Sequence, residues 1–513
     1  MNSGYLAGVD VGTTGVRCAI FDLGGKRIAS EYREYGASYP KPGWVEQDFD
    51  DLIAKTMEAC AATIARSQIS PERILSVAFS TQRSVTCPVR EDGAAVRPVI
   101  SWQDARTGAQ VEQMRALVDP AEYYATTGLP LGTTWIITKL LWMRANEPEK
   151  LARTHKILQV QDVVLHAFGA DGFFTDLSDM AFYGVWDVRK AKWNRRLLDL
   201  FGVSESFFGQ PTRSGTRVGA ITAAVAAKTG FKTGTPVCVG AGDQNCAVIG
   251  MGAIRSGIGT VTLGTAGLSI LSVDKPVPGF GGMMVTNHVL PAMWEIEGLS
   301  NAAAASYRWW RDLLGEKELG AQHPAGSAYA RLDELAAQSI PAAKGLLYLP
   351  YLATAGTPRW NANARAAFIG MSLSHGRPEM TRAVMEGVSL EIRDMIERWL
   401  AQGMPLEALR IGGGATKSRL WNQIQADVYG RPVQTLKEDE ATALGASILA
   451  GVGAGVFASV KEGVEAMVRV DAEIQPDPAR HCLYGDLYAA YVKAYQGLAD
   501  SGAFDALADL QSR

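Results

Sequence analysis

The 513-residue sequence has no basic run, no closely spaced cysteines and no clear membrane segment. Its 50 lysines and arginines are scattered among 53 aspartates and glutamates, for a net charge of −3, so a nucleic-acid partner is not expected. The six cysteines lie far apart, without a C-x-x-C pair or a metal-ligand spacing with the six histidines. Reduced, buried thiols are therefore expected.

Long hydrophobic runs are also scarce. The uncharged stretch 441–460 is long enough to cross a membrane, but it is rich in alanine and glycine and has few large apolar side chains. This composition favours a tightly packed internal helix and turn. A strand-like pattern is reached by Leu6, which leaves no room for a signal segment. We therefore expect a cytoplasmic protein with no membrane partner.

Two familiar nucleotide-binding motifs are missing as well. No G-x-x-x-x-G-K-[ST] occurs and no G-x-G-x-x-G follows a predicted strand, so a nucleotide site would need another design. The length suggests two to four domains of about 150 residues each. The composition, 47% hydrophobic and 20% charged, is that of an ordinary globular protein. Strand patterns mixed with helical patterns predict an α/β architecture.

Among the elements that are present, residues 5–34 are predicted to form three strands joined by tight turns, an antiparallel meander. A strand at 235–242 runs directly into Asp243 and a predicted helix. The other predicted elements are helices around 49–66 and 139–144, a strand at 74–80, a strand–turn–strand at 257–270, and a strand, glycine turn, helix and strand over 406–436.

The turns at 10–15 (DVGTTG) and 263–267 (LGTAG) share one design, once near the start of each half. Two related domains, each with a phosphate-facing hairpin turn and a boundary near residue 253, would explain the repeat. Such Gly-Thr turns are also common in any β hairpin, which is the alternative interpretation.

The first turn has the residue types that a phosphate site needs. Its glycines permit positive φ, so backbone amides can point outward, and Thr13, Thr14 and Arg17 add donors. Asp10 at the strand end is suited to hold Mg²⁺ through water, because Mg²⁺ keeps several waters and takes one or two carboxylates. An ordinary Asp-Gly turn is the alternative.

In the second half, Thr265 would approach the same phosphates from the opposite domain. The turn at 412–415 offers a bare backbone surface on which an adenine or a ribose can lie closely. The alternative for this turn is a tight connection between a strand and a helix.

Taken in order, these segments resemble the FGGY carbohydrate kinases, the family of glycerol kinase and xylulokinase. The stretch 366–386 agrees closely with a family signature, and the resemblance runs over nearly the whole chain. The segments that carry it are DVGTTGVR (10–17), TQRS (81–84), SWQDART (101–107), GAGDQNCAVIG (240–250), TVTLGTAG (260–267), AAFIGMSLSHGRPEMTRAVMEG (366–387), IGGGATKSRLWNQIQAD (411–427) and EATALGASILAGVGAGVF (440–457).

The resemblance implies an α/β fold of two actin-like (ribonuclease H-like) ATPase domains flanking a cleft, with ATP and Mg²⁺ as cofactors. Residues 1–252 would hold the sugar site and the first phosphate turn, and residues 253–513 the second phosphate turn and the adenosine site. The implied activity is phosphorylation of a hydroxyl of a small sugar or polyol, such as the ketopentose xylulose, in carbohydrate catabolism. The expected partner is that small molecule, with a homodimer as a further expectation.

The matching positions also imply roles for single residues. Asp10 would organise Mg²⁺, and Asp243 would be the catalytic base that accepts the proton of the substrate hydroxyl. The sugar site would contain Gln82, Arg83, Trp102, Asp104, Asp243 and Gln244. The nucleotide would contact Thr13, Thr14, Arg17, Gly264, Thr265, Gly413 and Gly414. Ala304, Arg308 and Ser418 stand at further nucleotide positions, where glycerol kinases carry Gly, Gln and Asn.

These roles agree with the chemistry of the side chains. Arg83 can donate to several hydroxyls, and Trp102 can pack on a carbon skeleton, although a surface arginine and a core tryptophan are the commoner fates. Asp243 stands at a strand–helix junction, where an N-cap role is the alternative. A helix N-terminus would also keep the Asp243 carboxylate ionised at an ordinary low pKa.

The substrate and the class of protein leave alternatives open. Ser84 stands where glycerol kinases carry a glutamate, which makes glycerol less expected than a ketopentose; erythritol, ribitol and autoinducer-2 are further alternatives. A non-catalytic actin-like or chaperone-like ATPase switch would not need the sugar-site residues. A sugar sensor without catalysis would be expected to have lost Asp10 or Asp243, and both are present.

Overall fold

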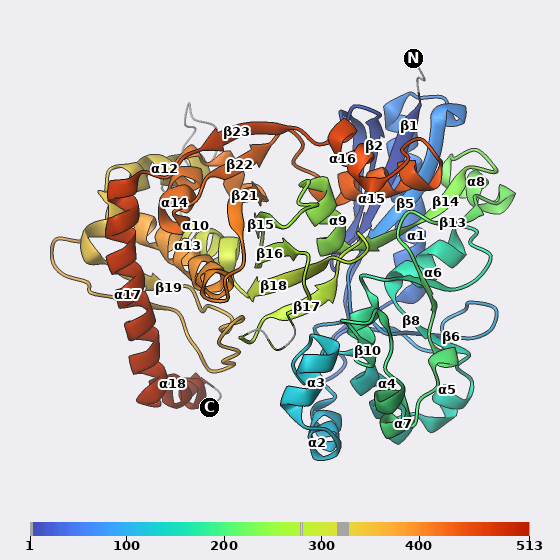
Figure 1. The fold of residues 1–513 in the computed structure, drawn as a ribbon, viewed down its shortest axis with the longest axis horizontal. Helices are drawn as coiled ribbons and strands as arrows, with labels where there is room; N and C mark the ends of the chain where they lie inside the picture. The colour runs from blue at the N-terminus through green and yellow to red at the C-terminus, as the bar shows by residue number, and fades with distance from the viewer. Residues whose placement is uncertain (1–3, 278, 280, 315–327, 512–513) are drawn as a thin grey trace.

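The computed structural model describes residues 4–277, 279, 281–314 and 328–511. Its main features are two large mixed β-sheets, one in each half of the chain, with helices packed around them (Figure 1). Two lobes result, the first from the blue-to-green part of the chain and the second from the yellow-to-red part. The late helices α15 (Ala441–Gly453) and α16 (Val460–Met467) are the exception, because they lie in the first lobe (Figure 1).

The first sheet has the strand order β13-β14-β5-β1-β2-β3. Strand β1 pairs antiparallel with β2 and parallel with β5, and β5 pairs parallel with β14. The central strands are almost completely buried, as expected for apolar strands covered on both faces. The strands are β1 (Tyr5–Val11), β2 (Gly15–Asp22), β3 (Arg27–Glu34), β5 (Ile74–Thr81), β13 (Arg217–Ala220) and β14 (Pro236–Gly242).

The second sheet has the order β17-β18-β16-β15-β21-β22-β23. Strand β15 pairs antiparallel with β16 and parallel with β21, and β21 pairs parallel with β22. The strands are β15 (Gly257–Leu263), β16 (Gly267–Val273), β17 (Met284–Asn287), β18 (Trp294–Ser300), β21 (Leu406–Gly412), β22 (Val433–Leu436) and β23 (Val470–Ile474).

The two sheets therefore share one topology. In each, an antiparallel hairpin (β1–β2 or β15–β16) is followed outward by two parallel strands and one antiparallel strand. The turns of these two hairpins are the two Gly-Thr segments singled out in the sequence. This duplication confirms the prediction of two related α/β units.

Short strands and helices complete both lobes. The short strands are β4 (Glu46–Gln47), β6 (Cys87–Val89), β7 (Val99–Ile100), β8 (Lys156–Leu158), β9 (Phe174–Asp176), β10 (Trp186–Asp187), β11 (Lys192–Trp193), β12 (Gln210–Thr212), β19 (Leu347–Leu349) and β20 (Ala367–Ile369). The 3₁₀ helices are η1 (Pro71–Arg73), η2 (Met180–Tyr183), η3 (Glu205–Phe207), η4 (Pro341–Gly345) and η5 (Gly414–Lys417). The α-helices are α1 (Phe49–Ser67), α2 (Gly108–Leu117), α3 (Pro120–Thr127), α4 (Ile136–Asn146), α5 (Pro148–Ala152), α6 (Val160–Ala167), α7 (Arg195–Phe201), α8 (Ala223–Thr229), α9 (Asp243–Gly250), α10 (Ala303–Leu314), α12 (Ala328–Ala337), α13 (Arg377–Ala401), α14 (Arg419–Tyr429), α15 (Ala441–Gly453), α16 (Val460–Met467), α17 (Pro478–Asp500) and α18 (Ala503–Gln511).

The elements predicted from local patterns are confirmed. The meander at 5–34 is β1–β3, the helix around 49–66 is α1, and the strand at 235–242 is β14 followed directly by α9. Helix α1 begins where Asp48 caps it, because the Asp48 carboxylate accepts the amide of Asp51.

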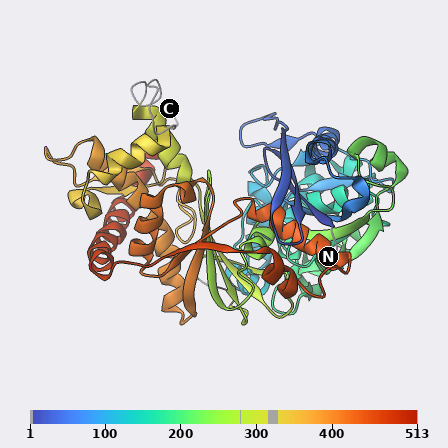
Figure 2. The ribbon, with the colours of Figure 1, turned by 90° about the horizontal axis from the view of Figure 1, so that it is seen from above.

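The uncharged stretch 441–460 forms α15 and the turn after it, and α15 packs on the first sheet although it comes late in the chain (Figures 1 and 2). Leu444 and Ile448 are buried in one cluster with Leu6 and Phe21 of β1 and β2. Helices α9 and α15 approach backbone to backbone: a Cβ on Gly445 would lie only 1.9 Å from the Cys246 carbonyl oxygen. Glycine is therefore required at this crossing.

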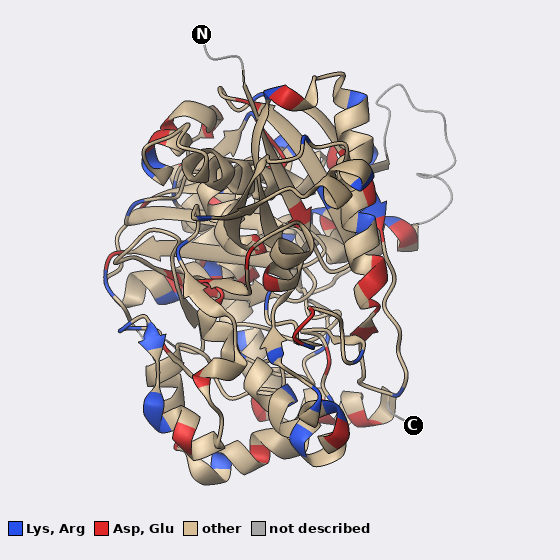
Figure 3. Ribbon diagram, turned by 90° about the vertical axis from the view of Figure 1, so that its right-hand side faces the viewer, with Lys and Arg blue, Asp and Glu red and all other residues tan. Residues whose placement is uncertain are grey.

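Within the described residues no helix is long and apolar enough to span a membrane. Acidic and basic residues are interspersed along the elements rather than gathered by sign, as Figure 3 shows for one side of the molecule. All six cysteines are free, and five of them are buried.

Candidate active site

The first hairpin presents Asp10 beside the ends of two neighbouring strands. Asp10 lies opposite Arg17 in the β1–β2 register, and its Oδ1 accepts a hydrogen bond from the Ser80 hydroxyl of β5 at 3.1 Å. Burial first, and then the nearby Asp243 carboxylate, raise the pKa of Asp10 to about 7. Two carboxylates close enough for one to raise the pKa of the other favour a bound cation.

Hydrogen bonds connect Thr13 of the first turn with two predicted sugar-site residues, Trp102 and Gln82, and with Gln47, which was not predicted. The Trp102 indole nitrogen donates to the Thr13 hydroxyl at 3.0 Å. The Gln47 amide donates to the Thr13 carbonyl at 2.7 Å, and the buried Gln82 amide donates to Gln47 Oε1 at 3.0 Å. Thr14 is exposed at the tip of the turn. Thr13, Gln82 and Trp102, predicted for different ligands, are thus structurally connected.

Arg17 forms an ion pair that the sequence did not predict. Its Nε lies 3.1 Å from Oε2 of Glu440, the residue immediately before α15. Arg27 of β3 also pairs with this acidic segment, at 3.1 Å from Glu438 and 2.9 Å from Asp439. The prediction that Arg17 contacts phosphate stays a prediction, since the guanidinium is half-buried and engaged through Nε.

Arg83 follows the carboxyl end of β5 and is held by several side chains. Its Nη1 and Nη2 donate to the two carboxylate oxygens of Glu297 on β18, at 2.8 and 2.6 Å. Nη1 also donates to Asn245 Oδ1 at 3.3 Å, and Nε lies 3.3 Å from Asp243 Oδ1. Most of the donor capacity that was predicted to serve substrate hydroxyls is therefore occupied by protein groups.

Asp243 is the first residue of α9, and Gly242 occupies the N-cap position. The N-cap alternative for Asp243 is therefore wrong: the backbone amide that its Oδ1 accepts, at 2.8 Å, is that of the neighbouring Gln244. Burial raises the pKa of Asp243 above its ordinary value, although the Arg83 charge lowers it. The expectation of an ordinary low pKa is thus wrong as well, because desolvation outweighs the helix N-terminus. The carboxylate keeps 28% of its side-chain surface exposed, which suits contact with a ligand.

Asp104 differs from the other predicted sugar-site residues. It is fully buried, and its oxygens accept two hydrogen bonds from the Arg106 side chain, at 2.8 and 2.7 Å, one from the Arg106 amide at 3.0 Å, and one from the Val45 amide at 2.6 Å. Arg106 also contacts Glu46 at 2.8 Å. Its acceptors are used in this internal network, and the substrate contact of Asp104 stays a prediction.

The second turn joins the start of α10. The Gly264 carbonyl accepts the Ala304 amide at 2.9 Å, and the Thr265 carbonyl accepts the Ala305 amide at 3.2 Å. Thr265 is exposed, as is Arg308, one helical turn after Ala304 on the same face of α10. The structure therefore brings Gly264, Thr265 and Ala304 together, with Arg308 nearby on the helix.

The glycine turn after β21 packs against the second hairpin. Gly413 has φ of 84°, and a Cβ there would lie 2.4 Å from the Leu263 carbonyl oxygen, so only glycine fits. A Cβ on Gly414 would meet nothing within 4 Å, which leaves an open backbone surface. Ser418 is buried and caps α14, its hydroxyl accepting the Trp421 amide at 3.0 Å.

Sequence reasoning missed three residues that hold the predicted ones: Gln47, Glu297 and Glu440. Glu297 had a local signal, because β18 (WEIEGLS) alternates Glu295 and Glu297 with apolar residues in a buried strand. A carboxylate in such a position needs a partner. Gln47 and Glu440 carry no comparable signal, since both stand in ordinary polar segments.

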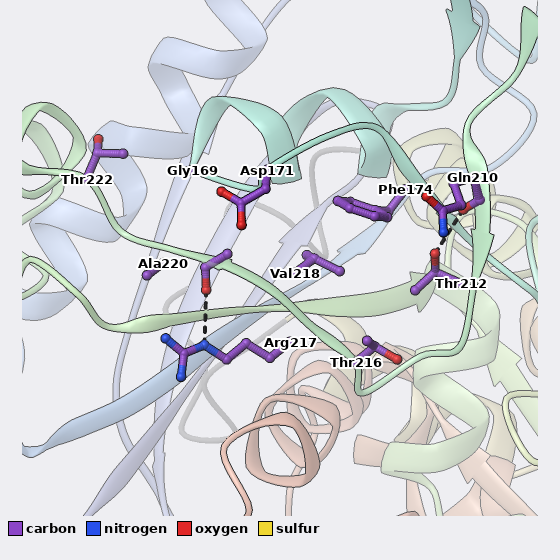
Figure 4. A pocket seen from close by; sticks show the side chains of 11 residues that line it. Gly169, Asp171, Phe174, Gln210, Thr212, Thr216, Arg217, Val218, Ala220 and Thr222 are labelled. Atoms are coloured by element: carbon purple, nitrogen blue, oxygen red, sulfur yellow. Dashed lines mark hydrogen bonds between the residues drawn. The ribbon is translucent and has the colours of Figure 1, made fainter.

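A surface pocket of about 630 Å³ lies elsewhere, at the edge strand β13 of the first sheet (Figure 4). Asp171, Phe174, Gln210 and Arg217 are among the side chains that line it. None of the predicted site residues contributes to it, so we place the candidate active site at Asp10, Arg83 and Asp243 on chemical grounds.

Comparison with known proteins agrees with this geometry. The model of the FGGY family of carbohydrate kinases, N-terminal domain, matches residues 5–250, and that of the C-terminal domain matches residues 259–454. A xylulose kinase from Staphylococcus epidermidis is 28% identical over 491 residues, which cover 95% of this chain and 96% of that protein. A glycerol kinase from Gloeobacter violaceus is 30% identical over 458 residues, which cover 88% of each.

Among solved structures, xylulose kinase from Rhodospirillum rubrum is similar with a TM-score of 0.87 and 28% identity, over 97% of this chain and 99% of that one. The predicted fold of two actin-like α/β domains is thereby confirmed, together with the resemblance of the motifs. The chain belongs to the FGGY family of carbohydrate kinases and is a phosphotransferase that acts on a hydroxyl of a sugar or polyol.

Proposed function

We propose that the protein transfers the γ-phosphoryl group of Mg-ATP to a hydroxyl of a small sugar, with a ketopentose such as xylulose as the first candidate acceptor. The observation that carries this proposal is the partly exposed Asp243 carboxylate at the start of α9, which lies beside Arg83 and near Asp10. A base, a cation and a metal-binding carboxylate are the groups that hydroxyl phosphorylation needs.

The residues around Asp10 fit a magnesium nucleotide. Within the described part of the chain, no group of three or more His, Cys, Asp or Glu side chains could hold a metal ion by itself. A magnesium ion at Asp10 would therefore take most of its ligands from water and phosphate oxygens, as Mg²⁺ usually does when it binds with a nucleotide. The exposed hydroxyls of Thr14 and Thr265 and the open backbone at Gly414 support phosphate and adenosine contacts.

Bound Mg-ATP supplies the electrophilic phosphorus and the charge neutralisation that its transfer requires. The chain's own contribution begins with Asp243, which orients the acceptor hydroxyl and takes its proton. Because phosphoryl transfer has a loose transition state, this proton leaves late and a carboxylate is basic enough. Arg83 keeps the Asp243 carboxylate in place through its Nε edge.

The surroundings of Arg83 bear on which acceptor the protein phosphorylates. Ser84, next to it, donates its hydroxyl to the Thr134 carbonyl at 2.8 Å and is buried, so no charged acceptor for substrate hydroxyls stands at this position. This disfavours glycerol. Relatives named xylulose kinase, at 25–29% identity over at least 95% of the chain, support a ketopentose.

Further predictions rest on the same proposal. We assign the sugar site and first phosphate turn to residues 1–252, and the second phosphate turn and adenosine site to residues 253–513, with α15 and α16 returning to the first lobe. A cytoplasmic location and a homodimer stay predictions; light scattering of the purified protein measures the second.

The test is an acceptor panel assayed for ADP release by purified protein with Mg-ATP, from glycerol and erythritol through ribitol, xylulose, ribulose and autoinducer-2. The expected result is a ketopentose with the highest kcat/KM. ATP turnover that no acceptor stimulates would contradict the proposal and favour an ATPase switch. Stimulation by glycerol alone would contradict the choice of acceptor.

A further inference from the structure

The ion pair between Arg83 and Glu297 joins the two sheets at the proposed base. Arg83 follows β5 of the first sheet, and Glu297 belongs to β18 of the second. Both oxygens of Glu297 accept from the guanidinium, Oε1 from Nη1 at 2.8 Å and Oε2 from Nη2 at 2.6 Å. Oε1 also accepts the Thr286 hydroxyl at 2.9 Å. Two parallel charge-assisted bonds fix both the position and the rotation of the guanidinium plane.

The rest of the guanidinium is also enclosed. Nη1 reaches Asn245 Oδ1 at 3.3 Å, and the planar group lies 4.7 Å from the centre of the Phe182 ring. Only the Nε edge points toward Asp243, at 3.3 Å. Arg83 therefore meets Asp243 through Nε, at 3.3 Å, while its double-donor edge, formed by Nη1 and Nη2, is paired at shorter distances with Glu297.

Several carboxylates compete for this one arginine. Asp243 and Asp179 both act on the Arg83 charge, and among the described residues neither oxygen of the buried Asp179 accepts a hydrogen bond. Asp179 lies close to the Arg83 side chain, since a Cβ on Gly242 would meet Arg83 Cδ at 2.3 Å and Asp179 Oδ1 at 2.5 Å. Without Glu297, the guanidinium would turn its double-donor edge to Asp243 or Asp179.

We propose that Glu297 is a positioning residue: it occupies Nη1 and Nη2 of Arg83, so that Asp243 is not drawn into a bidentate pair and keeps an oxygen free for the acceptor hydroxyl. This inference rests on the proposed role of Asp243 as base. In this proposal, β18 of the second sheet helps to form the sugar site beside the first sheet.

The test uses Glu297→Gln, with Glu295→Gln as matched control. Glu295 is equally buried on the same face of β18, but its carboxylate accepts a hydrogen bond from the Asn245 side-chain amide, at 2.8 Å. Burial first, and then the nearby Glu297 charge, raise the pKa of Glu295 well above its ordinary value, which favours the neutral form that glutamine resembles. The control should keep its kcat within about twofold, because an amide oxygen also accepts from Asn245.

Glu297→Gln should lower kcat at least tenfold while the KM for ATP stays within twofold. The acid limb of the pH profile of kcat/KM should move to lower pH, because Asp243 then gains a stronger cation partner and loses a nearby negative charge. Besides Arg83 and Glu297, the charged groups that act on Asp243 are Asp10 and Asp179, which stay unchanged. A structural role alone would not move this limb.

A crystal structure of the Glu297→Gln variant gives a readout that needs no acceptor. The guanidinium should be turned toward Asp243 or Asp179. An unmoved guanidinium, or wild-type kcat with an unmoved acid limb, would overturn the proposal. If this variant does not fold, the same measurements are made on Glu297→Asp. Its shorter carboxylate should draw Arg83 toward β18 and lower kcat severalfold. A wild-type kcat in Glu297→Asp would overturn the proposal.

The two proposals fail in different ways. If the wild-type protein phosphorylates no acceptor in the panel, the proposed function falls, and the crystal structure of the variant still decides whether Glu297 orients Arg83. If the wild type is active and the Glu297→Gln variant matches it in both kcat and pH profile, only the positioning role falls.

Discussion

The indole nitrogen of Trp102 donates a hydrogen bond to the hydroxyl of Thr13, with 3.0 Å between the two atoms. Trp102 was predicted to contact the sugar, and Thr13 the nucleotide phosphates. Their bond means that the hydroxyl of Thr13 also holds a residue of the sugar site, so its loss should be felt at both sites.

Thr13→Val should therefore raise the KM for the acceptor as well as that for ATP. It removes the acceptor of the indole N–H, at a cost of about 0.5–1.5 kcal/mol, which corresponds to about a two- to tenfold change. Trp102→Phe is the matched control, because it leaves the Thr13 hydroxyl available to phosphate and should raise only the KM for the acceptor. Steady-state kinetics in both substrates measures this; a rise confined to ATP in Thr13→Val would mean that the bond does not couple the sites.

The Arg17–Glu440 pair separates a phosphate role for Arg17 from a purely structural one. Both side chains are about one-third exposed, so the pair contributes only about 0–1 kcal/mol to stability. If Arg17 binds phosphate, Arg17→Ala should raise the KM for ATP about tenfold, the loss of one charge-assisted hydrogen bond. Glu440→Gln should leave it unchanged or lower it, because the guanidinium is released. Equal effects of both variants would contradict the phosphate role.

The affinity for Mg-ATP should depend on pH, because a proton competes with Mg²⁺ for the Asp10 carboxylate. Its pKa of about 7, raised first by burial and then by Asp243, means that most Asp10 is protonated at pH 6 in the metal-free protein. Affinity for Mg-ATP, measured by calorimetry, should fall about tenfold per pH unit below 7 and level off above it. The Asp10→Asn variant should show weak, pH-independent binding over the same range. A flat wild-type profile between pH 5.5 and 7 would contradict the raised pKa.

The raised pKa of Asp10 also makes the stability of the folded protein depend on pH. Because the folded state holds this proton more tightly than the unfolded chain, where the ordinary value is 3.8, the contribution of Asp10 is fully present below about pH 4 and is lost as the pH rises to 7. Added Mg²⁺ should restore stability mainly above pH 7. Thermal unfolding with and without Mg²⁺ measures both effects, and Asp10→Asn should abolish them.

The crossing of α9 and α15 predicts opposite outcomes for two glycine substitutions. Gly445→Ala would place a Cβ 1.9 Å from the Cys246 carbonyl oxygen and should cost about 1–3 kcal/mol, because one helix must move. Gly497→Ala, in the exposed part of α17 where a Cβ meets nothing within 4 Å, should stabilise by up to about 1 kcal/mol. Denaturant unfolding compares the two, and equal stabilities would contradict the tight crossing.

Much of the fold was predictable because its signals are local. Alternation and turn residues identify the hairpin of β1 and β2, and a strand that runs into a helix identifies β14 and α9. The place of α15 was not predictable: its composition indicates a buried helix but not which sheet it covers. That choice depends on shape, here on the glycines that let α15 approach α9.

The candidate site also contains residues that local motifs identify and partners that they do not. Asp10, Arg83 and Asp243 came from motifs, and they lie together in the structure. Their partners Glu440 and Glu297 lie 423 and 214 residues along the chain from Arg17 and Arg83, a separation at which no local pattern reports an ion pair. The pKa of Asp243 was mispredicted for a related reason, since burial by distant elements outweighs the helix terminus.

The most direct test of the central claim is the turnover of Asp243→Asn with the best acceptor. Asparagine keeps the shape and can still accept the Gln244 amide, so the variant should fold with a wild-type melting temperature. Removal of the base should lower kcat by about 10² to 10⁴ while the affinity for ATP changes little. A kcat within a few-fold of the wild type would contradict the assignment of Asp243 as the base, and with Asp104 engaged by Arg106, the base would then have to be sought outside the predicted residues.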